Sequence, residues 1–551
     1  MNWTIKLLFY LSLYTGLFGS DWSIRESYNA LFHSRSSTVH ATLHVNNLIR
    51  HGVENLANNE KTRLSEIGLS YQEDQIIILK SNTLDQSYDT EHFRFYYTLD
   101  STSNDAVENV EYVTTMASIY ENVWSFQMDS LGFDSPPVNP NNDHDLYEIN
   151  IEYLPSNYFA ITYGDGSGSS CYSTIKMRNS YTASQFSDHS EIENIQVTAS
   201  HEFFHAIQFG YNCYEAFWFM EASATWTEDE LYNDINDFYR YIPNFFLYPE
   251  KAINTETSFM YGTCILFQYI DEHLGGRETI RNTWNFSRDM ANPSSDISYK
   301  AIDAALNEVN SSLESAVTQM RVANQILSSS TNAGLYAYEE ADGYLTVVNP
   351  PPKTDYLIFE KGKIQTILNS SLRLYSSHYY SLYTDAPITL NLSELSGHFS
   401  LTSVVKINGE EKWVVKHGHE LNIDPKIGIE WIVIIVSAKG EEDYDWEYSL
   451  QLTDGYSEDF TLYPPYPNPS FGSSIQIDFQ VISEQTIQFR IVDIKGREIW
   501  NYSQYFPEPT VTQLSWTGKN KLGHPVANGI YFGIMKGNSK TSIYKITYLK
   551  K

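Results

Sequence analysis

The feature that most constrains the fold is a His-Glu-Phe-Phe-His motif at residues 201–205. On an α-helix, positions i and i+4 lie on one face, so His201 and His205 can direct both imidazoles at one metal ion. Glu202 then lies beside that ion, where a carboxylate can act on a water molecule. The segment Ile192–Phe209 is therefore predicted to be a helix with a metal-binding face.

A second predicted helix, from about Phe217 to Tyr232, carries the candidate for the third ligand. Glu221 lies on its apolar face beside Trp218 and Trp226, where a carboxylate is costly unless it is paired or bound to metal. A catalytic zinc site takes three protein ligands and keeps one position open. We therefore expect Zn²⁺ to be the cofactor, held by the two motif histidines and Glu221.

Other ligand sets fit the sequence less well. A longer motif with a third histidine would need Gly and His at the positions of Gln208 and Tyr211. Glu215 and Glu228 are weaker candidates than Glu221 for the third ligand. The structural alternative is a buried helix whose histidine pair is hydrogen-bonded without a metal.

The predicted chemistry is hydrolysis by activated water. Zinc lowers the pKa of its water and polarises a carbonyl, and Glu202 takes the proton and passes it to the leaving amine. A group that stabilises the oxyanion is also expected. Tyr261 is the candidate and His273 the fallback, while core packing is the alternative role for Tyr261. Thr225, four residues after Glu221, is a weak candidate for orienting a ligand.

The N-terminus predicts export. Lys6 precedes the apolar run Leu7–Phe18, and the small residues Gly19 and Ser20 are suited to cleavage. Residues 1–20 are therefore predicted to be a signal peptide, with an N-terminal core helix as the alternative. The rest of the sequence lacks a run of ~18 uninterrupted apolar residues, so the mature chain is not expected to insert into a membrane.

The chain has 551 residues, too many for one hydrophobic core, so several domains are expected. Residues 21–85 read as a helical segment, either a pro-segment or an N-terminal brace. The catalytic domain is predicted over 86–330, a β-sandwich over 331–456 and a final all-β domain over 457–551. Within the catalytic domain, the strand Cys171–Met177 is expected to be the sheet edge that pairs with an extended peptide.

The net charge limits the classes of binding partner, and the cysteines limit the possible disulfide bonds. The formal net charge of −32 argues against DNA, RNA and anionic lipid, which each need a basic surface. Of the three cysteines, Cys171 and Cys213 can form a bridge in an oxidising compartment, although buried free thiols fit equally well, and Cys264 is left over. Residues 21–85 contain no cysteine, which excludes a thiol latch on the metal from that segment.

The runs at 198–211 and 218–226 resemble gluzincin metallopeptidases, and a family of secreted bacterial metalloproteases first named from a myxobacterial locus. The likeness spans roughly 90–290. It implies an α+β zincin-like domain with His201, His205 and Glu221 on zinc. The Gly-x-Met-x-Asn signature that grips a substrate amino terminus in aminopeptidases is absent, which favours internal cleavage.

The C-terminus is similar to the type IX (Por) secretion sorting domain of Bacteroidetes-like bacteria. The matching pieces lie at 466–469, 491–498, 516–518 and 528–532. This resemblance implies an Ig-like fold, recognition by the type IX secretion machinery, and release or retention at the cell surface. An Ig-like structural module without a sorting role is the alternative.

The sequence thus predicts a secreted zinc endopeptidase that acts on proteins or peptides. A surface binding or adhesion protein with a structural or degenerate zinc site is the second hypothesis, supported by the tandem β domains. A glycan-binding or glycan-cleaving protein is ranked last, because no pair of catalytic carboxylates can be placed. The oligomeric state and the cleavage preference do not follow from the sequence.

Overall fold

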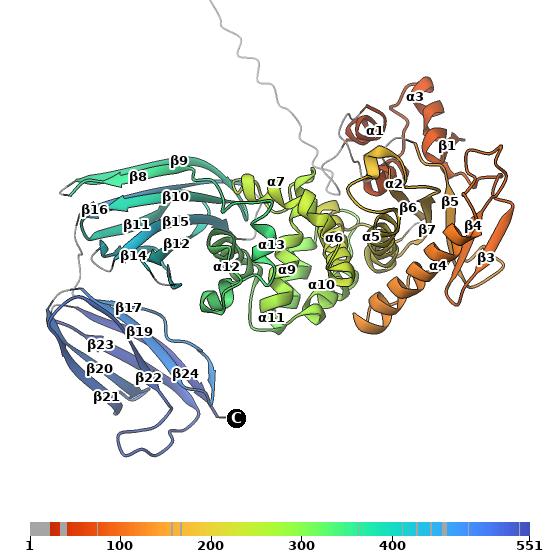
Figure 1. The fold of residues 1–551 in the computed structure, drawn as a ribbon. Helices are drawn as coiled ribbons and strands as arrows, with labels where there is room; N and C mark the ends of the chain where they lie inside the picture. Colours follow the sequence, from red (N-terminus) through yellow and green to blue (C-terminus); the bar gives the residue numbers. More distant parts are fainter. Residues whose placement is uncertain are drawn as a thin grey trace, which may run out of the picture. The chain divides into compact units, whose positions relative to one another are not determined.

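The computed structural model describes residues 23–33, 41–73, 75–155, 158–165, 168–361, 363–409, 411–425, 428–440, 444–454, 460–482, 484–538 and 540–550, with backbone alone at 368–371. The predicted signal peptide, residues 1–20, lies outside them. The chain divides into two compact units. Unit one runs to Thr354 and includes Leu372–Tyr379 and Ser437–Asp445; unit two holds the remainder. The chain is therefore multidomain, with helices and sheets in unit one and a large β-rich C-terminal region (Figure 1).

Unit one contains a five-stranded sheet in the order β3-β4-β5-β7-β6. Strands β4, β5 and β7 are parallel to one another, whereas β3 and β6 are antiparallel edge strands. Their bounds are β3 Gln86–Asp89, β4 Phe93–Tyr97, β5 Tyr147–Glu152, β6 Ala160–Asp165 and β7 Tyr172–Arg178.

The prediction that Cys171–Met177 forms the sheet edge is wrong. That segment is β7, which pairs with β5 on one side and β6 on the other. The edge strand on this side of the sheet is β6. Its apolar run is too short to be distinguished from the glycine-rich and serine-rich sequence after it. Because β6 and β7 form a hairpin, the chain returns β7 to the interior and leaves β6 outside.

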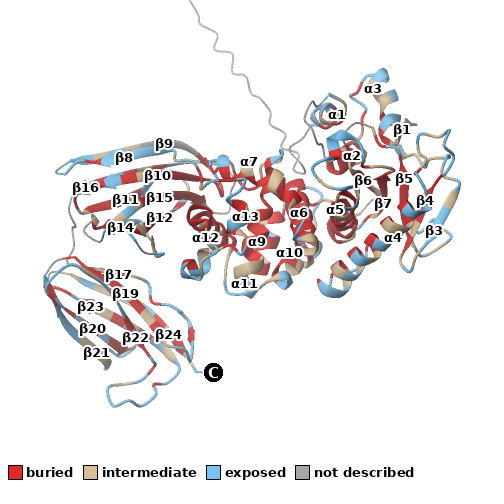
Figure 2. Cartoon of the chain, viewed as in Figure 1, coloured by how far each residue is buried: buried red, intermediate tan, exposed pale blue. Residues whose placement is uncertain are grey.

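The motif helix is α5 (Glu191–Asn212), and the helix after it is α6 (Phe217–Tyr232). Ser190 and Glu193 form a capping box that satisfies backbone N–H groups at the start of α5. Both helices are buried along most of their length (Figure 2). Just past the end of α5, Cys213 is disulfide-bonded to Cys171, which precedes β7, across a sequence separation of 42 residues. Cys264 is a buried free thiol.

Two N-terminal helices lie against the edge of the sheet. They are α1 (Ile24–His33) and α2 (Ala41–His51), and they are followed by α3 (Asn58–Arg63) and the hairpin of β1 (Leu69–Gln72) and β2 (Gln75–Ile78). Side chains of α1 and α2 share an apolar cluster with Ile161 and Tyr163 of β6. Helix α2 thus packs beside β6, as Figure 1 shows.

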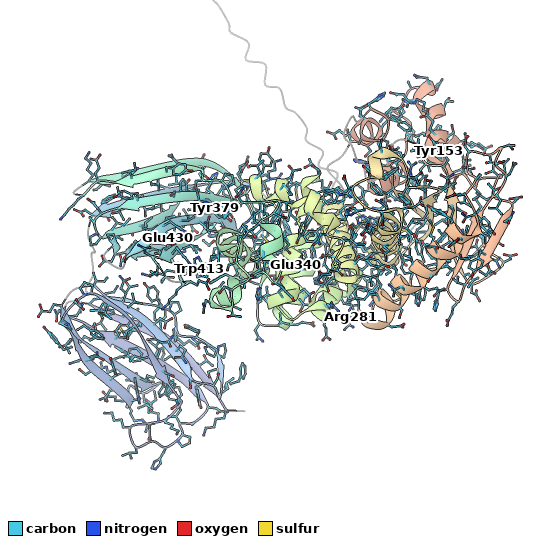
Figure 3. All side chains as sticks on the ribbon, viewed as in Figure 1. Tyr153, Arg281, Glu340, Tyr379, Trp413 and Glu430 are labelled. Atoms are coloured by element: carbon cyan, nitrogen blue, oxygen red, sulfur yellow. A yellow bond between two sulfur atoms is a disulfide. The ribbon has the colours of Figure 1, made fainter. Side chains whose placement is uncertain are left out.

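The remaining helices of unit one surround α5 and α6. They are α4 (Val110–Trp124), α7 (Ile242–Leu247), α8 (Phe259–Gly262), α9 (Cys264–His273), α10 (Arg277–Met290), α11 (Ser298–Glu308), α12 (Leu313–Ile326) and α13 (Ala341–Tyr344). Tyr379, labelled in Figure 3, donates its hydroxyl to the carbonyl of Arg321 on α12 at 2.8 Å. Such contacts attach Leu372–Tyr379 to unit one.

The β-rich region begins at Asp355, later than the predicted boundary at 331. Residues 331–344 instead form a short 3₁₀ turn and α13, which bury Tyr338 and Tyr344 in the core of unit one. The chain then forms a five-stranded sheet, β13-β12-β15-β10-β8, and a four-stranded sheet, β14-β11-β16-β9. The bounds are β8 Asp355–Phe359, β9 Ile364–Arg373, β10 Ser377–Thr384, β11 Ile388–Glu394, β12 His398–Ile407, β13 Trp413–His417, β14 Glu420–Ile423, β15 Ile429–Lys439 and β16 Asp445–Asp454.

The C-terminal part is a two-sheet sandwich. A three-stranded sheet, β17-β19-β22, and a five-stranded sheet, β18-β24-β23-β20-β21, share one apolar core. The bounds are β17 Phe460–Leu462, β18 Ser470–Phe471, β19 Ile475–Val481, β20 Gln485–Asp493, β21 Glu498–Phe506, β22 Thr510–Trp516, β23 Gly529–Lys536 and β24 Thr541–Leu549. Across the described ranges, no helix combines the length and apolar character needed to cross a membrane.

Candidate metal centre

Three side chains from α5 and α6 converge in the core of unit one. The potential ligand atoms of His201, His205 and Glu221 all lie within 4.8 Å of one another. The two Nε2 atoms are 3.0 Å apart, and Glu221 places one carboxylate oxygen 3.0 Å from His201 Nε2 and the other 3.6 Å from His205 Nε2. The structure therefore brings together the three ligands that the sequence predicts.

Hydrogen bonds on the far side of each ring fix which nitrogen faces the cluster. His201 Nδ1 lies 2.6 Å from a carboxylate oxygen of Glu228, so it donates there. His205 Nδ1 lies 2.7 Å from Gln208 Oε1, whose amide orientation is set by donation to the Met220 carbonyl at 2.8 Å. Both Nε2 atoms can consequently present lone pairs to the centre, as metal-bound histidines do.

The centre gathers three buried groups that can each bind a cation. Glu221 is fully buried, and its two carboxylate oxygens face the Nε2 atoms of His201 and His205 at 3.0 Å and 3.6 Å. A buried carboxylate beside two lone pairs is strongly unfavourable unless a cation joins them. Two imidazole nitrogens and a carboxylate oxygen are the ligand set of a common class of catalytic zinc sites. The residues thus fit a zinc ion.

The ionisation of the two histidines agrees with this arrangement. Burial lowers the pKa of His205 to about 4, so its imidazole is neutral and available as a ligand. Burial also opposes charge on His201, but hydrogen bonds and the charges of Glu221 and Glu228 outweigh it and raise the pKa of His201 well above the ordinary value. A positive charge is thus favoured at His201 Nε2, where either a proton or a metal ion can supply it.

Glu202 lies next to the cluster and is held by two hydroxyl groups. Its Oε2 accepts hydrogen bonds from Thr162 of β6 at 2.6 Å and from Thr42 of α2 at 2.7 Å. The side chain is 2% exposed. Because both hydroxyls occupy Oε2, Oε1 is the oxygen that can take a proton from water.

A small cavity adjoins His201 and Glu202. Its volume is about 20 Å³, and Asp237, Arg240 and Tyr241 line another part of its wall. A cavity of this size holds about one water molecule. The site therefore has room for a hydrolytic water but, as it stands, none for a peptide.

The candidates for stabilising the oxyanion lie at different distances from the cluster. Tyr261 on α8 lies with its ring 6.5 Å from that of His201, and after burial itself the nearby carboxylate of Glu221 is the main influence that raises its pKa. Tyr241, whose ring packs 4.8 Å from that of Tyr261, lines the cavity instead. His273 lies elsewhere and bonds to the Ala337 carbonyl at 2.8 Å.

The two weaker candidates for the third ligand have other roles. Glu228 orients His201, as described above, and does not enter the cluster. Glu215 accepts a hydrogen bond from Ser287, and burial raises its pKa to about 8. The hydroxyl of Thr225 has no hydrogen-bond partner among the described residues, so it orients neither histidine.

Comparison with known proteins gives one family match. Residues 68–315 match a family described only as a family of unknown function (DUF6055). The match contains Glu202 and all three candidate ligands and begins after α3. No curated protein matches the chain.

Several solved structures share weak likeness with the chain. PorZ, a surface component of the type-IX secretion system of Porphyromonas gingivalis, is 16% identical over 18% of this chain and 14% of that one, with a TM-score of 0.13. Dimeric latent PorU of P. gingivalis is 14% identical over 30% and 18%, with a TM-score of 0.19. A Parabacteroides merdae β-glucuronidase is 9% identical over 31% and 27%, with a TM-score of 0.16. The chain spans under a third of each, and such scores carry no conclusion.

Sequence reasoning missed several residues around the centre. Gln208 lies three positions after His205, so helical spacing could have identified it as the partner of that ring. Glu228 lies seven positions after Glu221 on the same face of α6, and the sequence predicts it only as a weaker candidate for the third ligand. Thr42 and Thr162 come from distant segments, and no local pattern marks either of them.

Proposed function

We propose that this chain is a zinc-dependent endopeptidase of the gluzincin type, with an α+β zincin-like catalytic domain. One observation carries the proposal: two imidazole nitrogens and the fully buried carboxylate of Glu221 converge next to Glu202. Zinc bound there by His201, His205 and Glu221 supplies Lewis-acid activation of water and of a scissile carbonyl.

The chain's own residues complete the reaction. Glu202 accepts a proton from the attacking water at Oε1 as the water oxygen bonds to the carbonyl carbon. It then delivers that proton to the amine nitrogen as the carbon–nitrogen bond breaks. Thr162 holds the carboxylate in place through Oε2, and Glu228 and Gln208 keep the two histidine rings in position. Tyr241 and Tyr261 are both candidates for stabilising the oxyanion.

Edge strand β6 is the part of the domain suited to hold a substrate. An extended peptide can add to a sheet edge through main-chain hydrogen bonds, and Thr162 connects this edge directly to Glu202. Such binding does not require a free substrate terminus, which favours internal cleavage of proteins and peptides.

We further propose that the enzyme acts outside the cell. Residues 1–20 serve as signal peptide, and the C-terminal sandwich serves as an Ig-like sorting domain for type IX secretion. The motif pieces of that sorting domain fall at structured positions: 491–498 spans the β20–β21 turn, and 528–532 begins β23. The protein is then released or kept at the cell surface.

A second candidate function is a surface binding or adhesion protein with a structural zinc site. The observation that favours it is the cavity beside Glu202, which at about 20 Å³ admits no peptide. Under this hypothesis zinc is present in stoichiometric amounts but peptides are not cleaved.

Metal removal tests the two functions against each other. We expect the purified chain to hold about one zinc and, once the N-terminal helices are removed as described below, to cleave casein or a peptide library, with activity lost after chelation and restored by zinc. Chelation should also lower the midpoint of thermal unfolding, because zinc binds only the folded state. The measurements are elemental analysis, peptide mass spectrometry and calorimetry. Zinc at full occupancy without cleavage, also after the N-terminal helices are removed as described below, would favour the binding protein.

Replacing Glu228 tests the role of the hydrogen bond to His201. We expect Glu228→Ala to weaken zinc binding about 10–100-fold, as loss of an outer hydrogen-bond partner does. Glu228→Gln keeps an acceptor for Nδ1 and should remain closer to wild type. Competition with a chromophoric chelator measures both affinities. Equal affinities in Glu228→Ala and wild type would contradict this role.

A further inference from the structure

The polar groups along the outer edge of β6 are already occupied in this structure. The Thr162 N–H donates to Thr42 Oγ1 at 2.9 Å, and the Gly164 N–H donates to Asn46 Oδ1 at 2.7 Å. Asn46 Nδ2 donates to the Thr162 carbonyl at 2.7 Å. Two side chains of α2 thus supply the donors and acceptors that a neighbouring extended peptide would offer to this edge.

Helix α2 also reaches the proposed general base. Thr42 Oγ1 accepts from the Thr162 N–H and donates to Glu202 Oε2, so one hydroxyl connects the sheet edge to the catalytic carboxylate. Thr42 is fully buried. A peptide lying along β6 and reaching Glu202 would have to displace this side chain.

Apolar packing keeps the two helices in place. Val45 and Leu48 of α2 and Tyr28 of α1 share a cluster with Ile161 and Tyr163 of β6. The phenol of Tyr158 also donates to the carbonyl of Leu31 on α1. The helices therefore cover side chains of β6 as well as its main-chain groups.

We propose that helices α1 and α2 form a built-in inhibitor that occupies the peptide-binding edge of β6 and covers Glu202. The inference rests on the proposed endopeptidase function and adds its regulation. Activation then requires these helices to leave, for example by cleavage after α2.

The turn after α2 allows a direct experiment. Glu54 and Asn55 are both exposed, so a recognition sequence for a site-specific protease can be inserted between them in the full chain. After cutting, the released segment is removed by chromatography. We expect hydrolysis of a fluorogenic peptide to rise at least tenfold relative to the uncut chain, and to fall again when the segment is added back.

Amide hydrogen exchange provides a readout that does not depend on activity. On removal of the helices, the N–H groups of Thr162 and Gly164 lose their acceptors, so their exchange should accelerate at least tenfold. Faster exchange without hydrolysis of any peptide would support the covering of the edge and refute the endopeptidase proposal. Unchanged exchange, or a loss of hydrolysis with zinc retained, would show that the helices are a brace and overturn the inference.

A point variant keeps the test decisive even if the cut chain unfolds. Thr42→Val retains the shape of the side chain but removes its hydroxyl, which leaves the Thr162 N–H without an acceptor in the closed state. Hydrolysis by the uncut chain should then rise about tenfold. Thr62→Val is the matched control, because that exposed hydroxyl bonds only within α3. Equal hydrolysis by the two variants would count against the inference.

Discussion

A Glu202→Gln chain is expected to bind zinc as wild type does and to hydrolyse peptides roughly 10²–10⁴-fold more slowly. Glutamine keeps the shape of the side chain and can still accept hydrogen bonds from Thr42 and Thr162, but it cannot take a proton from water. The effect should therefore appear in kcat, with zinc content unchanged. Steady-state kinetics on the activated enzyme, together with elemental analysis, measure the two quantities.

The matched control for this variant lies on the same helix. Glu193→Gln makes the same chemical change at the start of α5, where glutamine also completes a capping box with Ser190. We expect its kcat to equal that of wild type. If Glu202→Gln were as active as Glu193→Gln, Glu202 would not be the general base and the proposed mechanism would be wrong.

Glu221→Ala is expected to abolish stoichiometric zinc binding. The substitution removes the only carboxylate among the three clustered ligands, so the loss of affinity should exceed the roughly 10–100-fold expected for an outer hydrogen-bond partner. Hydrolysis should disappear with the metal. Zinc content after dialysis against a weak chelator measures the first effect, and circular dichroism verifies that the variant is folded.

Glu215→Gln is the control for Glu221→Ala. Glu215 is also a buried glutamate close to the start of α6, but it bonds to Asn212 and Ser287 rather than entering the cluster. We expect this variant to keep one zinc per folded chain. If Glu221→Ala retained zinc and Glu215→Gln lost it, Glu221 would not be the third ligand.

The ligand cluster could be predicted because its geometry is local. The spacing of His201 and His205 fixes their common face on α5, and the apolar surroundings of Glu221 identify it as a carboxylate in need of a cation. The bounds of α6 also follow from the sequence, since apolar residues begin at Phe217 and recur at helical spacing to Tyr232.

The surroundings of the cluster could not be predicted, because they depend on contacts between distant segments. Thr42 and Glu202 are 160 residues apart in sequence, and Thr162 and Glu202 are 40 apart. The place of β6 at the sheet edge depends on how the chain pairs β7 with β5, which alternation of residues does not reveal. Likewise, the start of the β-rich region shifted because residues after 331 pack aromatic side chains into the helical core.

The disulfide between Cys171 and Cys213 has a consequence for the helix that carries both histidines. The bond closes a loop, across a separation of 42 residues, that contains β7, all of α5 and both histidine ligands. Closing such a loop restricts the unfolded chain and stabilises the folded one. Thiols stay reduced in the cytosol and pair in oxidising compartments. In an oxidising environment the disulfide therefore links the end of α5, the helix that carries both histidines, covalently to the start of β7.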